Sequence, residues 1–197
     1  MRTAQFAAAV AGLIAAMPAG AATIAFSGTF TNTNPPASPT GRCAPAASTV
    51  SIAPGLGTNA GTSNFGSFTA TNSHCIVLPL PAPYTDGLFS YAFDAGDVLR
   101  GTYSGALSTT VTPGTFANLQ NFVVTGGTGR FAGASGSFTG TGNVVFGSGP
   151  PSAFVTLSGL VNAPAVPEPA SWALFVTGFG IIGAALRTRR GGSYVVQ

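Results

Sequence analysis

Large apolar side chains recur at every second position over much of the chain, and this period limits the possible fold more than any other feature. Around Phe26 and Phe30, and again over 89–93, apolar residues alternate with small or polar ones. That period is typical of a β-strand with one buried face. The segment 94–97 contains a glycine and turns the chain into 99–104, where the alternation resumes. We therefore expect antiparallel hairpins.

The alternation continues toward the C-terminus, and no part of 22–165 carries a sustained helical stripe. Further strands are expected over 122–124, 131–138, 142–146 and 154–161, with Gly, Asn, Ser and Pro in the gaps. The pattern predicts an all-β fold, a single antiparallel β-barrel. A β-sandwich is the alternative that strand spacing leaves open.

A different pattern occupies the C-terminal part of the chain. The apolar run 170–186 contains no charged side chain, and as a helix it would be about 25 Å long, the short end of what crosses a bilayer. Arg187, Arg189 and Arg190 follow directly. Such a cluster holds its end of a membrane helix on the cytoplasmic side. The segment therefore predicts a transmembrane helix that leaves the preceding chain outside.

A Pro-Glu-Pro motif stands immediately before this apolar run. The residues of the whole pattern are, in order, Pro167, Glu168, Pro169, Trp172, Arg187, Arg189 and Arg190. Together they resemble the PEP-CTERM sorting signal of Gram-negative bacteria. The resemblance implies transient anchoring in the inner membrane and processing by an exosortase-type membrane enzyme, and it implies a link with exopolysaccharide and biofilms. This chain departs from the family pattern by continuing past the arginines.

The N-terminal end carries a second targeting signal. Arg2 precedes the apolar run 6–17, which is followed by Pro18 and small residues. This arrangement is typical of a signal peptide read by the Sec export machinery, with cleavage expected after Ala21 or Ala22. The signals divide the chain into a signal peptide at 1–21, a secreted all-β domain at 22–165, the sorting signal at 166–190 and a short tail at 191–197.

The formal net charge of +3 comes entirely from the targeting segments. Four arginines less Glu168 supply four minus one charges there, whereas the secreted domain holds three arginines and three aspartates, which cancel. No basic stripe remains, so we expect no nucleic-acid partner.

Three segments of the secreted domain carry a second resemblance. They are 72–75, 94–105 and 124–136, in that order. The last is similar to the strand-turn-strand of allene oxide cyclase-like and dirigent-like barrels. The resemblance implies an eight-stranded antiparallel barrel, and it supplies no catalytic positions.

Both cysteines, Cys43 and Cys75, fall in the exported domain. An even count in an oxidising compartment predicts one disulfide, which would tie the Pro-rich segment 34–47 to a strand entering at Ile76. His74 precedes Cys75, but neighbours in a strand point to opposite faces, so a nucleophilic His–Cys pair is not expected. His74 is the only histidine and there is no Cys-x-x-Cys, so we expect a structural, hydrogen-bonded histidine and no metal site.

Two other patterns have ordinary explanations. Asp94 and Asp97 flank a turn and are expected to cap it, with calcium binding as the alternative. The GxGxxG match at 178–183 lies inside the membrane segment, and 126–133 lacks the lysine of a phosphate loop. Neither predicts nucleotide binding.

The secreted domain offers few groups for hydrolytic or transfer chemistry, since it has three aspartates, one histidine, no lysine and no glutamate. We therefore expect a non-enzymatic exported protein, with no catalytic residues and no cofactor. It would be held in the membrane by its C-terminal helix before processing and then lie at the cell surface or in the extracellular matrix.

Three alternatives remain open. A binding module could use a surface face for glycan, or it could hold an apolar ligand in a barrel cavity lined by several of Phe26, Phe89, Tyr91, Phe93, Tyr103 and Phe122. A small isomerase or cyclase would need Tyr91, Arg100 or Asp94 to converge in that cavity. Outward threonines, as in 29–31 and 139–141, also permit an ice-binding surface.

Overall fold

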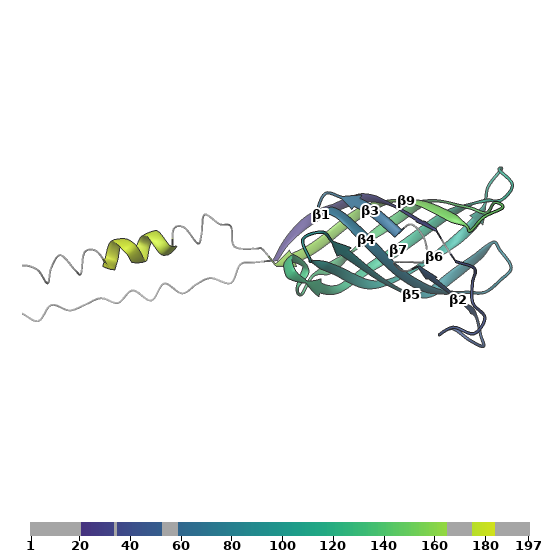
Figure 1. The fold of residues 1–197 in the computed structure, drawn as a ribbon, viewed down its shortest axis with the longest axis horizontal. Helices are drawn as coiled ribbons and strands as arrows, with labels where there is room; N and C mark the ends of the chain where they lie inside the picture. Colours follow the sequence, from purple (N-terminus) through teal and green to yellow (C-terminus); the bar gives the residue numbers. More distant parts are fainter. Residues whose placement is uncertain (1–20, 34, 53–58, 165–174, 184–197) are drawn as a thin grey trace, which may run out of the picture.

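The computed structural model describes residues 21–33, 35–52, 59–164 and 175–183 (Figure 1). Within the secreted domain the described residues form strands and one short 3-10 helix, η1. The elements are β1 (Ala21–Thr33), β2 (Ser48–Ile52), β3 (Asn59–Ser63), β4 (Gly66–Ile76), β5 (Ala82–Phe93), β6 (Val98–Thr109), β7 (Thr115–Thr128), η1 (Gly129–Phe131), β8 (Ser135–Val145) and β9 (Ser152–Pro164).

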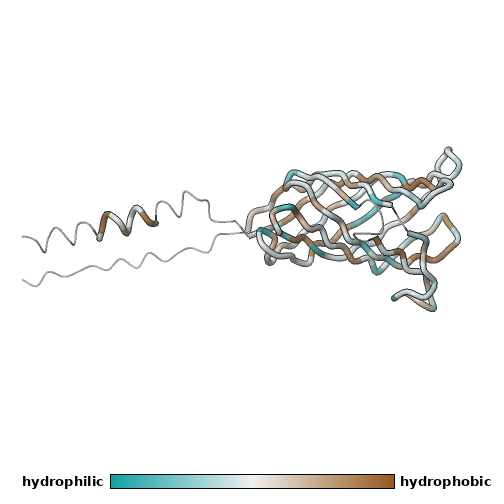
Figure 2. The backbone as a smooth tube through the Cα atoms, in the orientation of Figure 1, coloured by the Kyte–Doolittle hydropathy of each residue, from teal (hydrophilic) through white to brown (hydrophobic). Residues whose placement is uncertain are grey.

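The strands close into one antiparallel barrel, which confirms the barrel over the sandwich. The order around the sheet is β2-β4-β3-β1-β9-β8-β7-β6-β5, and β5 pairs back onto β4. β2 and β3 pair with successive parts of β4, so together they fill one position in a closed barrel of eight. Along the strands, hydrophobic and hydrophilic residues succeed one another at short intervals (Figure 2), as a wall with one buried face requires.

Glycines lie opposite aromatic rings, and this explains how a narrow barrel accepts so many large side chains. Phe89 pairs with Gly101, and a Cβ atom on Gly101 would lie 2.7 Å from the Phe89 ring. Tyr84 pairs with Gly105 in the same way, and a Cβ there would overlap the Tyr84 ring. An eight-stranded barrel is only just wide enough for side chains to fill it, so a large residue needs a very small one opposite.

The middle of the barrel is filled by packed rings, here called the aromatic plug: Phe26, Phe68, Phe89, Tyr91, Phe93, Tyr103, Phe122, Phe131 and Phe138. Ring centroids of Phe122 and Phe138 are 4.6 Å apart, as are those of Phe26 and Phe138. Every member is at most 4% exposed. The predicted ligand cavity lined by Phe26, Phe89, Tyr91, Phe93, Tyr103 and Phe122 is therefore wrong, because these rings pack against one another.

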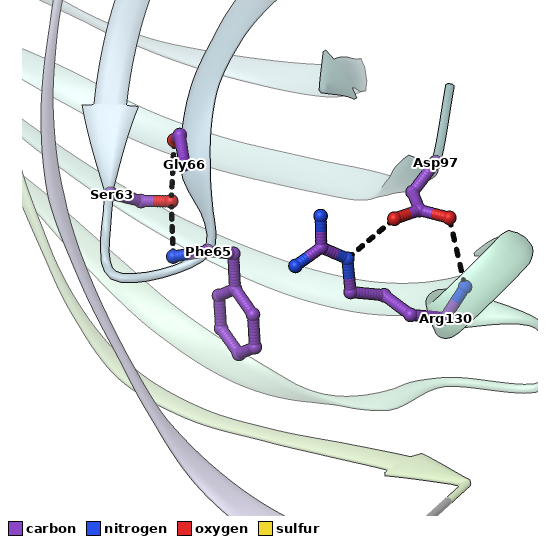
Figure 3. A network of polar contacts seen from close by, with 5 residues as sticks. All are labelled: Ser63, Phe65, Gly66, Asp97 and Arg130. Atoms are coloured by element: carbon purple, nitrogen blue, oxygen red, sulfur yellow. Dashed lines mark hydrogen bonds and ion pairs between the residues drawn. The ribbon is translucent and has the colours of Figure 1, made fainter. Parts of the chain in front are cut away.

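Arg130 covers one end of the aromatic plug, and Figure 3 shows its side chain beside Asp97 and the ring of Phe65. Its guanidinium carbon lies 5.5 to 5.9 Å from the ring centroids of Phe65, Phe93 and Phe131, within the range of cation–π attraction. Nε of Arg130 donates to Asp97 Oδ2 at 2.5 Å, and the Arg130 backbone N–H donates to Asp97 Oδ1 at 3.1 Å. Hydrogen bonds from Arg130 hold the pKa of Asp97 below its ordinary value. Asp97 thus ties the β5–β6 turn to η1.

The connection between β7 and β8 differs from the predicted strand over 131–138. Phe131 belongs to η1, and β8 begins only at Ser135. Gly129 and Gly133 have φ values of +59° and +71°, a left-handed conformation that interrupts a strand. Nearby, the Ser63 hydroxyl accepts a hydrogen bond from the Phe65 N–H at 3.1 Å, and this contact fixes the β3–β4 turn (Figure 3).

The chain enters and leaves the barrel at this same covered end, because Ala21 pairs with Pro164. At the opposite end, β1 finishes at Thr33 beside the start of β9 at Ser152. The loops there span 35–47, 77–81, 110–114 and 146–151, and we call this end the mouth.

Only part of the predicted targeting segments falls within the described residues. A helix occupies 175–183 of the predicted membrane segment 170–186. In the described ranges, no helix combines the length and the hydropathy needed to traverse a bilayer. Residues outside those ranges include 1–20 of the signal peptide and the sorting residues Pro167, Glu168, Pro169, Trp172, Arg187, Arg189 and Arg190.

Candidate ligand-binding site at the mouth of the barrel

A cavity of about 170 Å³ opens at the mouth, beyond the aromatic plug. Most of its wall is apolar and comes from strands and mouth loops together: Pro35, Pro36, Ala37, Val50, Ile52, Ile76, Leu78, Leu80, Leu107, Val144, Phe146, Pro151 and Ala153. Five polar side chains complete the lining, and we call them the polar group: Asn32, His74, Tyr84, Asn118 and Gln120. None of the lining residues is Asp, Glu, Lys or Arg.

Strand β7 brings two members of the polar group inward by its register. Asn118, Gln120 and Phe122 are buried at successive inward positions, so the polar residues lie between the mouth and the aromatic plug. Leu119, between them, points outward and is 49% exposed. This stretch of β7 therefore reverses the usual arrangement, with amides inside the barrel and leucine outside.

His74 is held in a fixed orientation inside the cavity. Its Nδ1 shares a hydrogen bond of 2.7 Å with the Tyr103 hydroxyl, and its ring centroid lies 4.4 Å from that of Tyr84. Burial, and secondarily the charge of Arg42, lowers the pKa of His74 from 6.5 to about 4. The ring is therefore neutral at neutral pH. As the alternation predicted, His74 points inward while the neighbouring Cys75 lies on the other side of β4.

Tyr84 joins the remaining inward polar groups of the cavity. Its hydroxyl donates to Oδ1 of Asn118 at 2.6 Å. Burial raises the pKa of Tyr84 well above its ordinary value, and a hydrogen bond from the Gln120 side chain opposes this shift.

The polar group does not satisfy its own hydrogen-bonding capacity. Oδ1 of Asn32 and Oε1 of Gln120 are buried without a partner, in side chains that are each 5% exposed. Nδ2 of Asn118 and Nε2 of His74 make no hydrogen bond to the described residues either. A buried polar atom without a partner costs about 1–3 kcal/mol of folding stability. The polar group therefore lowers the stability of the barrel if it has only a structural role.

The predicted disulfide is present and fastens a mouth loop over the cavity. Cys43 in the loop 35–47 is bonded to Cys75 in β4, with Cα atoms 5.5 Å apart. The strand that it reaches ends at Ile76, whereas the sequence suggested a strand entering there. Arg42 adds a hydrogen bond from Nε to the Ser73 hydroxyl at 2.9 Å, and its Nη2 donates to backbone carbonyls of β4 and β5. Pro35, Pro36 and Ala37 of this loop line the cavity.

The residues proposed for an isomerase do not meet in the cavity. Arg100 and Asp94 are exposed, on β6 and in the β5–β6 turn, and Tyr91 is buried in the aromatic plug. Asn32, Asn118 and Gln120 were not predicted as site residues, although the amides on either side of Leu119 in β7 were a visible signal. Across the described ranges, no three His, Cys, Asp or Glu side chains are grouped closely enough to hold a metal ion.

The comparisons with known proteins bear on the tail and on the fold. The family model of the PEP-CTERM protein-sorting motif matches residues 165–190, as the sequence pattern predicted. This motif implies export and membrane anchoring before processing. No curated protein matches the chain in sequence. The solved structure of the pterocarpan synthase dirigent protein GePTS1 is similar with a TM-score of 0.44 and 10% identity, over 82% of this chain and 100% of that one.

Proposed function

We propose that the protein is an exported, non-enzymatic binding protein that takes up a small neutral molecule at the mouth of its barrel. The signal peptide at 1–21 would direct it to the Sec machinery. The sorting signal would hold it in the inner membrane until an exosortase-type enzyme processes it, after which it lies at the cell surface or in the extracellular matrix. The secreted barrel is the part that carries the binding function.

The observation that carries this proposal is the unsatisfied polar group inside an apolar cavity. Binding sites for small molecules are mostly apolar concavities with a few fixed polar groups that orient the ligand. A barrel with only a structural role has no use for several unpartnered polar atoms, since apolar residues there would be more stable. A ligand that accepts hydrogen bonds from the unpartnered N–H groups of Asn118 and His74 offsets part of this cost.

The same cavity favours binding over catalysis. Among the residues that the structure describes, His74 and Tyr84 are the only titratable ones that line it. The pKa of His74 falls to about 4 and that of Tyr84 rises, so both stay neutral across the physiological range. General acid–base catalysis works best with a pKa near the working pH, and neither of these two groups has one near neutrality.

Fluorobenzene observed by fluorine NMR tests whether the cavity binds anything, because an engineered apolar cavity of about 150 Å³ takes up benzene. We expect its line to broaden with protein isolated from the exported fraction. Val144→Phe, which fills the cavity, should abolish the broadening. Val145→Phe is the matched control, since Val145 is the next residue of β8 and points outward. Equal broadening by both variants would place the binding elsewhere and refute the proposal.

Mass spectrometry of the surface fraction tests the sorting part of the proposal. We expect the wild-type protein to have lost the segment from Ala170 onward, and Glu168→Ala to retain it. Ser193→Ala, in the tail beyond the arginines, serves as the control and should be processed normally. A mature wild-type protein that keeps its tail would instead indicate a plain membrane anchor.

A further inference from the structure

Asn118 presents its amide nitrogen to the cavity in an orientation that its neighbours determine. The Tyr84 hydroxyl donates to Oδ1 of Asn118 at 2.6 Å, so the amide oxygen is occupied. Nδ2 has no hydrogen-bond partner among the described residues, although the side chain is only 6% exposed and lines the cavity. An amide nitrogen only donates. A ligand atom that reaches Asn118 therefore has to accept.

His74 supplies a second donor, by an argument from its tautomer. The only side-chain partner of the buried Tyr103 hydroxyl among the described residues is Nδ1 of His74, at 2.7 Å. If Nδ1 carried the proton, the hydrogen of that buried hydroxyl would have no acceptor. Tyr103 therefore donates to Nδ1, and the proton of the neutral ring resides on Nε2. Nε2–H is left for a ligand in the cavity that His74 lines.

Both donors adjoin Tyr84 and line the same cavity. The His74 ring packs against the Tyr84 ring with centroids 4.4 Å apart, and the Tyr84 hydroxyl contacts Asn118. A single oxygen with two lone pairs can accept from two donors. A carbonyl oxygen has this capacity and needs no donor in return.

The remainder of the cavity restricts the charge and size of the ligand. No charged side chain lines it, and Arg42, the charge that affects His74, is directed to Ser73 and to backbone carbonyls of β4 and β5. An ion buried there would lose its hydration without gaining a counter-ion. The volume of about 170 Å³ is close to that of a cavity of roughly 150 Å³ that holds benzene.

We propose that the mouth cavity takes a neutral carbonyl compound, with an apolar body about the size of a six-membered ring, whose oxygen accepts hydrogen bonds from Asn118 and His74. This inference rests on the proposed function, since it names the ligand class of the same cavity. Ionised acids, ionised amines and plain hydrocarbons of that size should bind more weakly than the carbonyl compound.

A matched set of ring compounds tests the ligand class with protein isolated from the exported fraction. The probes are cyclohexanone, methylenecyclohexane, cyclohexanecarboxylate and cyclohexylammonium, titrated while the side-chain amide signals of asparagine are followed by NMR. We expect cyclohexanone to bind about fivefold or more tightly than methylenecyclohexane, as one or more net hydrogen bonds provide, and the two ions not to bind. Equal affinity for cyclohexanone and methylenecyclohexane would overturn the proposal that the ligand is a carbonyl compound, but the cavity would still be a binding site. If neither fluorobenzene nor any of these rings binds, the proposed function itself fails.

An exchange of one atom in Asn118 tests the assigned donor. Asn118→Asp keeps an oxygen for the Tyr84 hydroxyl and removes the amide N–H, so cyclohexanone affinity should fall about fivefold when it is measured at alkaline pH, where the new carboxyl group is ionised and offers no O–H donor. Asn121→Asp makes the same change at an exposed position of the same strand and should leave the affinity unaltered. Equal affinities in the two variants overturn the role of Asn118. If circular dichroism shows that Asn118→Asp does not fold, the comparison of ketone with hydrocarbon in the wild-type protein decides.

Discussion

Two buried asparagines in this barrel should respond to the same substitution with opposite signs. Asn72 is 2% exposed and neither its Oδ1 nor its Nδ2 has a partner. Asn118 is similarly buried, but its Oδ1 accepts from the Tyr84 hydroxyl at 2.6 Å. Valine is close to asparagine in size and suits a strand, so Asn→Val isolates the polar difference at each site.

The hydrogen-bond partners of each asparagine determine how much its substitution changes the free energy of unfolding. Each buried polar atom without a hydrogen bond costs about 1–3 kcal/mol, and Asn72 has two such atoms, so Asn72→Val should raise the free energy of unfolding by about 2–6 kcal/mol. Asn118→Val leaves the Tyr84 hydroxyl with only the Leu119 carbonyl at 3.4 Å, and should lower that free energy by about 1–3 kcal/mol. The two variants should therefore differ by about 3 kcal/mol or more.

Urea unfolding followed by circular dichroism measures both variants, with unchanged m-values as the check that the denatured state is the same. The Asn72 amide lies beside the Tyr91 hydroxyl and lowers the Tyr91 pKa against the stronger effect of burial, but the contact lacks hydrogen-bond geometry. A loss of more than about 1 kcal/mol in Asn72→Val would show that this contact is a hydrogen bond after all. It would refute the assignment of Asn72 as unsatisfied.

Three further predictions concern the disulfide and two titrating groups. Replacing both cysteines with serine should lower the free energy of unfolding by ~3–4 kcal/mol in urea, because the bond closes a long loop in the unfolded chain. The folded-state pKa of His74 is about 4 against 6.5, so the unfolded chain binds the proton first and stability should fall by roughly 3 kcal/mol as the pH drops through that window; His74→Asn should lack this loss in pH-dependent melting. The pKa of Asp97 is instead lowered below 3.8 by Arg130, so its stabilisation is complete above that value and lost as the pH falls beneath it. Asp97→Asn should be less stable than wild type at neutral pH, with the difference vanishing in acid.

The fold could be predicted from the sequence because one period governs most of it. Alternation around Phe26, Phe30 and Tyr91 identifies half-buried strands, and glycine-containing turns make their pairing antiparallel. Closure into a barrel does not follow from alternation alone, since a sandwich has the same period. What decides closure is the pairing of β5 with β4, a long-range contact. The pairing of Cys43 with Cys75 was predictable because no other pairing exists within one chain.

The site could not be predicted in the same way, because alternation separates two faces without saying which one is buried. In β7 the apolar Leu119 and Val123 are exposed, while Asn118 and Gln120 face the interior. A prediction that places hydrophobic residues inside would therefore turn Leu119 inward and the two amides outward, the reverse of what the structure has. The aromatic rings were correctly expected inside the barrel, but their mutual packing, which fills the interior, depends on cross-strand glycines such as Gly101. The pairing register of the strands places each ring opposite its glycine, and this register cannot be derived from alternation.

The pairing of Ala21 with Pro164 limits how the barrel can stand on a membrane while its tail is held there. Residues 165–169 can extend the tether by about 20 Å at most. The thirteen residues of β9 run about 40 Å along a strand, or about 30 Å of barrel height at the usual tilt. If residues 170–186 span the membrane as the sequence predicts, a barrel tethered in this way could lean over but could not invert, so its mouth would point away from the lipid when it stands upright. Until the tail is processed, the mouth cavity would then open toward molecules outside the membrane.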